Sequence, residues 1–238
     1  MKKILLVSGC SFTTKNFTSI FHPDMICDWP KWPEILGEKL NMDVINLGQS
    51  GSGNEYIFSS LIDAMANMNR EEIGLVIPAW SQCLRRDWIE GNFRLNMTIS
   101  DKGDLRYHVN KSMRYYYLFQ FYCETNSIPY KQLQMIEFIR KGNARKEKLR
   151  QSILDRNLDN DYENGSSYIK NSIYYDKIKS KNFIGYPMKR ELGGFPIQDR
   201  VTDFRKKELE YIFRLSKEDA HPSKIGHEMI AEYLYENI

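Results

Sequence analysis

The chain has 238 residues, of which 42% are hydrophobic and 13% aromatic. This length and composition support one large domain with a packed interior and argue against a disordered chain. The formal net charge of +3 is too balanced to indicate nucleic acid by itself, and no apolar run approaches the ~18–20 residues of a membrane helix, so we expect no nucleic-acid partner and no membrane partner.

Apolar runs and helical stripes alternate along the first third of the chain. A continuous apolar run that ends at Gly9 predicts a short buried strand, and the spacing of Trp32, Ile35 and Leu36 predicts a helix. In chain order, we expect a strand at 3–8, a helix at 32–40, a strand at 43–47, a helix at 54–68 and a strand at 73–79. This alternation predicts βαβ units and a parallel sheet.

Periodicity is weaker in the rest of the chain, where 87–109 has no clear period and 157–165 is polar and rich in turn residues. The elements expected here are, in chain order, a helix at 112–125, a strand at 129–136, a helix at 137–154, a short strand at 182–186 and helices at 203–215 and 223–235. The predicted fold class is α/β: a three-layer α/β/α sandwich with a parallel sheet of about five strands. We expect a single domain over 1–238, with elaborated loops at 85–110 and 157–203.

The first candidate site residue is a serine at the end of the first predicted strand. In an open α/β sheet, ligands bind outside the carboxyl ends of the strands. Ser11 follows the first strand within the sequence Gly-Cys-Ser-Phe-Thr. A serine on such a glycine-led turn is well placed for a nucleophile, and its backbone N–H can point toward an oxyanion. The alternative is an ordinary turn serine that caps a helix.

A glycine-rich turn follows the second predicted strand. Gly48, Gly51 and Gly53 stand just before a predicted helix, where glycine lets the backbone approach a ligand closely and exposed N–H groups bind negative charge. Their spacing matches neither a Walker loop nor the GxGxxG pattern. The alternative is a tight connection between strand and helix.

A histidine beside two carboxylates precedes the last predicted helix. Glu218, Asp219 and His221 are followed by Pro222 and Ser223, and a histidine oriented by an acid can serve as a general base. Asp219 shares a side with His221 if the segment is extended, whereas Glu218 does so in a helical turn. The alternative is that Asp219 or Ser223 caps the helix and His221 is incidental.

Together, the three segments resemble the SGNH (GDSL-like) hydrolase family. Ser11 matches the serine of that family's block I, the pattern Asn46-x-Gly48-x-x-Gly51 matches block II, and Asp219-x-His221-Pro-Ser resembles block V. The resemblance covers both ends of the chain and is thin from 88 to 217. The chain looks most like small family members from phage and environmental bacterial genomes.

The resemblance implies a serine hydrolase, an esterase or acylhydrolase, with carbohydrate O-deacetylation as the favoured substrate class. In the implied triad, His221 takes the proton of Ser11 and Asp219 orients the imidazole, with Glu218 as the alternative acid. The implied oxyanion donors are the N–H groups of Ser11 and Gly51. The implied mechanism needs no cofactor and no metal, and the implied partner is a small ester or an acylated carbohydrate.

One departure from the family pattern bears on activity. The third block of the family has an asparagine that donates to the oxyanion, but here Trp80 is followed by Ser81 and Gln82. The hydroxyl of Ser81, the amide of Gln82 or the side chain of Asn54 is expected to replace it. Loss of one such donor costs about 3–4 kcal/mol. A catalytically impaired structural or binding protein of a phage particle therefore stays an alternative, as does an O-acyltransferase on the same fold.

Three further expectations concern binding, thiols and location. Asn54 and Arg85 are candidate substrate-binding residues; Arg85 would bind an acidic group, or else it is a surface arginine. The four cysteines are widely spaced and form no ligand cluster with the four histidines, so we expect free thiols and neither disulfides nor zinc. The start of the chain resembles a lipoprotein signal, but its apolar stretch is too short and cleavage before Cys10 would remove the first strand. We expect a cytoplasmic location, or the host cytoplasm or virion for a phage-encoded chain.

Overall fold

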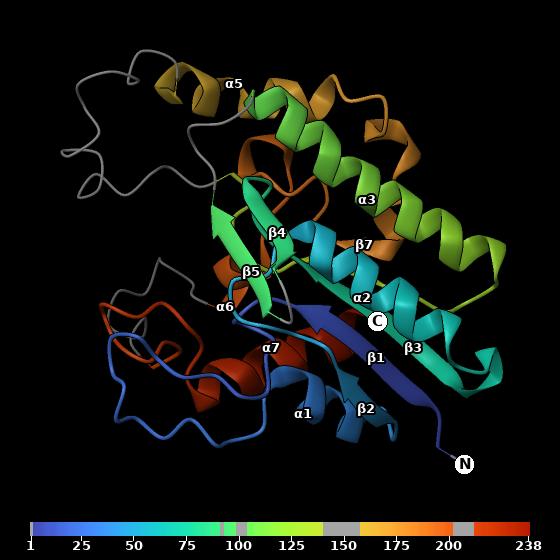
Figure 1. The fold of residues 1–238 in the computed structure, drawn as a ribbon, viewed down its shortest axis with the longest axis vertical. Helices are drawn as coiled ribbons and strands as arrows, with labels where there is room; N and C mark the ends of the chain where they lie inside the picture. Colours follow the sequence, from blue (N-terminus) through green and yellow to red (C-terminus); the bar gives the residue numbers. More distant parts are fainter. Residues whose placement is uncertain (1, 91–92, 99–103, 140–157, 202–211) are drawn as a thin grey trace.

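The computed structural model describes residues 2–90, 93–98, 104–139, 158–201 and 212–238 (Figure 1). Within these residues, five strands form a parallel sheet in the order β2-β1-β3-β6-β7. The bounds of its strands are Ile4–Gly9 for β1, Asp43–Asn46 for β2, Ile73–Trp80 for β3, Gln132–Gln134 for β6 and Phe183–Ile184 for β7. This sheet confirms the predicted fold class, and β1, the first strand of the chain, lies inside the sheet between β2 and β3.

Helices cover both faces of the sheet, with α1 and α7 on one face and α2 and α3 on the other (Figure 1). The helix bounds are Trp32–Lys39 for α1, Asn54–Ala66 for α2, Leu105–Thr125 for α3, Leu158–Lys170 for α5, Ile197–Val201 for α6 and Lys224–Asn237 for α7. Short 3₁₀ turns lie at Arg70–Glu72, Tyr175–Lys177, Ser180–Asn182 and Arg190–Leu192. The two layers of helices complete the α/β/α sandwich.

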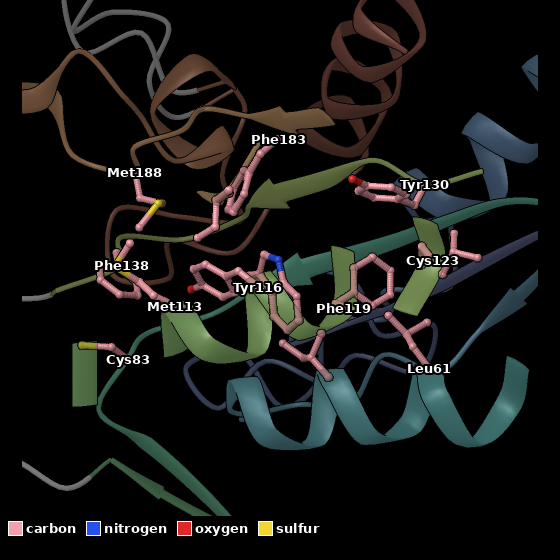
Figure 2. Packing of buried hydrophobic residues seen from close by; sticks show 14 of the residues in the cluster. Leu61, Cys83, Met113, Tyr116, Phe119, Cys123, Tyr130, Phe138, Phe183 and Met188 are labelled. Atoms are coloured by element: carbon pink, nitrogen blue, oxygen red, sulfur yellow. The ribbon is translucent and has the colours of Figure 1, made fainter. Parts of the chain in front are cut away.

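The alternation of side chains along β1 explains this layering. Leu5 and Val7 point into a core that they share with α1 and α7, whereas Leu6 points into the core on the opposite face, because successive strand residues face opposite sides. All three side chains are fully buried. The second core is aromatic: Tyr116 and Phe119 of α3 lie among side chains of α2, β3 and β7 (Figure 2). Burial of both faces explains why this strand is a continuous apolar run.

An antiparallel hairpin stands beside the main sheet, within the stretch that lacks a clear period in the sequence. Its strands are β4, Arg85–Glu90, and β5, Phe93–Thr98, and their register pairs Asp87 with Asn96 (Figure 1). The side chains of β4 are all half-buried or exposed, so no apolar face is needed to form it. The elaborated loop expected at 85–110 contains this hairpin, and the first residues of α3 lie at its end.

Helix α3 begins at Leu105, seven residues earlier than expected, and runs on to Thr125. Asp104 caps it, since its carboxylate accepts the Arg106 N–H at 2.8 Å. Helix α5 begins at Leu158, within the second elaborated loop expected at 157–203, although the sequence from 157 to 165 is polar and rich in turn residues. Gly165 and Ile169 are both buried and lie four residues apart, on one face of α5.

Two expected helices fall largely outside the described residues. The prediction at 137–154 is not helical at 137–139, and 140–157 lie outside the described residues. The prediction at 203–215 is not helical at 212–215, where Arg214 forms a bridge with Pro222, and 202–211 lie outside the described residues. The part of the chain that the structure describes has no helix that is both long and apolar enough to cross a membrane.

Candidate active site

Ser11 lies on a tight turn directly after β1, at the carboxyl edge of the sheet. The Thr13 N–H donates to the Cys10 carbonyl at 2.8 Å, which closes the turn. Gly9 lets it fold this closely, because a Cβ there would lie 2.3 Å from Oγ1 of Thr13. The Ser11 hydroxyl oxygen is 2.8 Å from Nε2 of His221. The structure thus brings together two residues that are 210 positions apart in the chain.

His221 contacts Asp219 through its other ring nitrogen. Nδ1 of His221 forms a short hydrogen bond with Oδ1 of Asp219, and the backbone N–H of His221 donates to the same oxygen at 3.0 Å. The rings of Phe12 and Phe17 pack against the imidazole, at centroid distances of 5.1 and 4.3 Å. Ser11, His221 and Asp219 therefore form one hydrogen-bonded chain, the arrangement in which a histidine can take a serine proton.

Of the two candidate acids, Asp219 is the one in contact with His221. The segment 219–221 is extended enough for residues two apart to share a side, as the hydrogen bonds show. Glu218 is exposed, and its backbone N–H donates to the Ser216 hydroxyl at 3.2 Å. Glu218, the alternative acid, is therefore not positioned by the structure as the partner of His221.

Asp219 is buried, with only 1% of its surface exposed. Burial alone would raise the pKa of its carboxyl group, but hydrogen bonds from the Ser19 hydroxyl and from His221 outweigh burial and lower the pKa. The Ser19 hydroxyl donates to Oδ2 at 2.5 Å and accepts the N–H groups of Phe21 and His22. Asp219 is thus held as a carboxylate. Sequence reasoning missed Ser19, because a serine 200 residues from its partner carries no local signal.

The glycine turn after β2 runs beside the Ser11 turn. The Gln49 N–H donates to the Gly9 carbonyl at 3.0 Å, so pairing with β1 continues past the end of β2. Gly51 has φ +77°, and a Cβ there would lie 2.2 Å from Oδ1 of Asn96. Both the left-handed backbone and the lack of space require glycine at this position. The two predicted donor turns, those of Ser11 and Gly51, leave the sheet as neighbours.

The side chain of Asn54, expected as a replacement for the missing oxyanion donor, bonds to core groups instead. Its side chain is buried, accepts the Ser81 N–H at 2.8 Å and donates to the Ser81 carbonyl and the Tyr116 hydroxyl. Since its amide bonds to these core groups, Asn54 holds the segment after β3. The Ser81 hydroxyl is itself fully buried and has no hydrogen-bond partner among the residues that the structure describes, and Gln82 is also buried. The structure leaves none of these three side chains open at the surface.

Arg85 lies on the hairpin, and its guanidinium Nη1 donates to the Ser52 carbonyl at 3.1 Å. The predicted substrate-binding arginine is therefore bonded to the glycine turn. Sequence reasoning also missed Asp87 and Asn96, which contact the same turn from the same hairpin. No period marks the hairpin in the sequence, so no signal there pointed to these contacts.

His227 of α7 and the four cysteines are buried outside the group formed by Ser11, His221 and Asp219. His227 is buried and its Nδ1 accepts the Trp32 N–H at 3.3 Å, and burial lowers the pKa of its imidazole to about 3. It is therefore a neutral side chain that joins α7 to α1. All four cysteines are free and buried. Among the described residues, no three histidine, cysteine or acidic side chains are grouped so that they could hold a metal ion.

Comparisons with known proteins identify the fold. No family model and no curated protein sequence matches the chain. Its structure is similar to a lipase from a goat rumen metagenome (TM-score 0.53, 13% identity, covering 99% of this chain and 97% of the lipase). It is also similar to a catalytic mutant of an acetylxylan esterase from Geobacillus stearothermophilus (0.52, 13%, 99% and 93%) and to a protein assigned to the lipolytic G-D-S-L family from Desulfitobacterium hafniense (0.50, 17%, 99% and 99%). The chain therefore has the fold of the SGNH, or G-D-S-L, hydrolases.

Proposed function

We propose that this chain is a serine hydrolase that cleaves esters through an acyl-enzyme on Ser11. The observation that carries the proposal is the hydrogen bond of 2.8 Å between the Ser11 hydroxyl and Nε2 of His221, whose Nδ1 bonds to Asp219. A serine hydroxyl is a weak nucleophile until a base accepts its proton. The fold, which the chain shares with several esterases and lipases, supports the same reaction class.

In the proposed reaction, the Ser11 oxygen attacks the ester carbonyl while His221 takes the hydroxyl proton. The tetrahedral oxyanion accepts hydrogen bonds from the N–H groups of Ser11 and Gly51. His221 then gives its proton to the departing alkoxide, which leaves as an alcohol, and the acyl group stays on Ser11. A water molecule, deprotonated by His221, attacks this second ester; the bond between the acyl carbon and the Ser11 oxygen breaks, His221 returns the proton to that oxygen, and the acid is released. The Asp219 carboxylate stabilises the imidazolium formed in both steps.

The substrate class that we propose is a small acyl group, such as acetyl, esterified to a carbohydrate hydroxyl. One structural neighbour is an acetylxylan esterase, which is consistent with this class. A panel of p-nitrophenyl acetate, butyrate and octanoate, run beside an acetylated xylan, tests it. We expect the highest kcat/KM on acetate and release of acetate from the polysaccharide. A preference for octanoate would contradict the substrate class while leaving the reaction class intact.

Labelling with a fluorophosphonate probe, located by peptide mass spectrometry, tests the reaction class. We expect the label on Ser11 in the wild type and none in Ser11→Ala or His221→Ala, with kcat/KM lower by about 10⁴-fold or more in both variants. Ser59→Ala is the control, because Ser59 is an exposed serine on α2. A folded wild-type protein that takes no label and hydrolyses no ester would contradict the proposal and favour the non-catalytic alternative.

A further inference from the structure

The β4–β5 hairpin presents three polar side chains to the glycine turn from one of its faces. Asp87 and Asn96 are directly paired across the two strands, and Arg85 lies two residues before Asp87. Side chains at alternate positions of a strand, and those of a directly opposed pair, lie on the same face. Arg85 and Asp87 are half-buried, whereas Arg86 and Glu90 on the opposite face are exposed.

These three side chains bond to the backbone on both sides of Gly51. Asn96 Nδ2 donates to the Ser50 carbonyl at 3.3 Å, and Arg85 donates to the Ser52 carbonyl at 3.1 Å. The Asp87 carboxylate accepts the Gly53 N–H at 3.0 Å and the Tyr56 N–H at 3.1 Å. The contacts therefore reach residues 50, 52 and 53 and leave Gly51 between them. In addition, the Asn96 carboxamide fills the space that a side chain at residue 51 would need.

The contact of Asp87 with the first turn of α2 is a helix N-cap interaction supplied by another element. Gly53 is the N-cap of α2 and has no side chain to bond the free N–H groups of the first helical turn. The carboxylate of Asp87, on another element, accepts the N–H groups of Gly53 and Tyr56 in place of a capping side chain on α2. A negative charge at a helix N-terminus is also favoured by the helix dipole. The start of α2 is thereby fixed in direction, and the turn that leads into it is fixed with it.

From these contacts we infer that the hairpin belongs to the active site and that Asp87, Arg85 and Asn96 are positioning residues for the Gly51 N–H. The inference rests on the proposed function for its catalytic consequence. A glycine turn is conformationally free by itself, whereas an oxyanion donor acts well only when it is held in place before the reaction. The segment directly after β3, residues 81–84, contains no asparagine, so the proposed reaction depends on the two backbone donors of Ser11 and Gly51. The hairpin holds one of them.

The test compares Asp87→Ala with Glu90→Ala, which removes the same charge from the opposite face of the same strand. We expect Asp87→Ala to lower kcat for p-nitrophenyl acetate, and the rate of fluorophosphonate labelling of Ser11, by about 10–100-fold, with KM changed much less, because misplacing a catalytic group by 1 Å costs up to about 10²-fold. Glu90→Ala should stay within about twofold of wild type. Asp87→Asn keeps an oxygen for the Gly53 N–H and should recover most of the loss.

A second variant and a second measurement distinguish loss of positioning at Gly51 from loss of folding. If Asp87→Ala does not fold, Asn96→Ala replaces it, because Asn96 is exposed and its loss opens no core. Hydrogen exchange followed by mass spectrometry should show faster exchange of the peptide covering 48–56 in the folded Asp87 or Asn96 variant than in wild type and Glu90→Ala. Unchanged kcat and unchanged exchange in that variant would overturn the inference. A wild type that takes no label would instead refute the proposed function, and the exchange data would still decide whether the hairpin holds the turn.

Discussion

Replacing Ser19 by alanine removes a single hydroxyl group that holds the acid of the proposed triad. This hydroxyl donates to Oδ2 of Asp219 at 2.5 Å, while Oδ1 of the same carboxylate bonds to His221. Both Ser19 and Asp219 are 1% exposed, so water does not reach the bond in the wild type. Alanine at this position leaves one oxygen of a buried carboxylate without its donor.

The magnitude follows from the kind of bond that is lost. A buried hydrogen bond to a charged group contributes about 1.5–3 kcal/mol to the free energy of unfolding. For a chain of this size, each 1 kcal/mol lowers Tm by about 2–4 °C, so Ser19→Ala should lower Tm by roughly 3–12 °C at pH 7. The pKa of Asp219 should rise in the variant, because one of the bonds that lower it is gone. This contribution to stability is present above the unfolded-state pKa of the carboxyl group and is lost as the pH falls through the lower folded-state pKa.

Denaturant unfolding at several pH values, Tm and kcat for ester hydrolysis measure these effects together. We expect kcat to fall by about 3–30-fold on the proposed function, because a less firmly held carboxylate stabilises the imidazolium less well. The difference in stability between wild type and variant should shrink as the pH falls through the folded-state pKa of Asp219. Ser19→Thr keeps a hydroxyl and should recover much of both losses. If Ser19→Ala were as stable and as active as wild type, with the same pH dependence of stability, the reasoning would be refuted.

Two more predictions use matched variants. Gly51→Ala should cost about 1–3 kcal/mol of stability and lower the rate of Ser11 labelling, because the new Cβ meets both a left-handed φ of +77° and the Asn96 side chain. Gly193→Ala is the matched variant: it meets a φ of +85° in open space, so it should cost about 1 kcal/mol without affecting labelling. Equal effects of the two variants on labelling would contradict this prediction. The imidazole of His227 has a folded-state pKa of about 3, against a usual value of 6.5, so between these pH values the unfolded chain binds more protons than the folded chain. The contribution of His227 to the free energy of unfolding should therefore fall by about 2 kcal/mol from pH 7 to pH 5. In urea unfolding at both pH values, His227→Gln should lose most of that difference, and an unchanged difference would show that another group titrates.

The parts of the fold and the site that follow from the sequence are those encoded by neighbouring residues. The buried strand before Gly9 is a continuous apolar run because both of its faces are covered, so its position could be predicted from composition alone. Gly51 stands out because a turn between strand and helix often needs a left-handed residue. His221 and Asp219 are two residues apart, so an extended backbone is enough to place them together. Each of these signals lies within a few residues.

The parts that could not be predicted depend on contacts between distant segments. Helix α5 has a polar sequence, and its buried Ile169 lies in the core that also contains side chains of α3. The hairpin has no buried face, so its strands carry no apolar alternation. Asn54 was expected at the turn because it is close in sequence, but its side chain enters the core, where Ser81 and Tyr116 offer hydrogen-bond partners. Nearness in sequence does not determine the direction of a side chain.

The packing of α7 against α1 explains how residues from the two ends of the chain reach hydrogen-bonding distance. Ser11 is placed by β1, whose burial between β2 and β3 leaves little freedom at its carboxyl end. His221 precedes α7, which lies against α1 in the same core as Leu5 and Val7. His227, on the first turns of α7, accepts a hydrogen bond from the Trp32 N–H at the start of α1, so the register between the two helices is set close to the site. Apolar burial therefore fixes where α7 begins, and the five residues between His221 and His227 bring the imidazole of His221 over the serine.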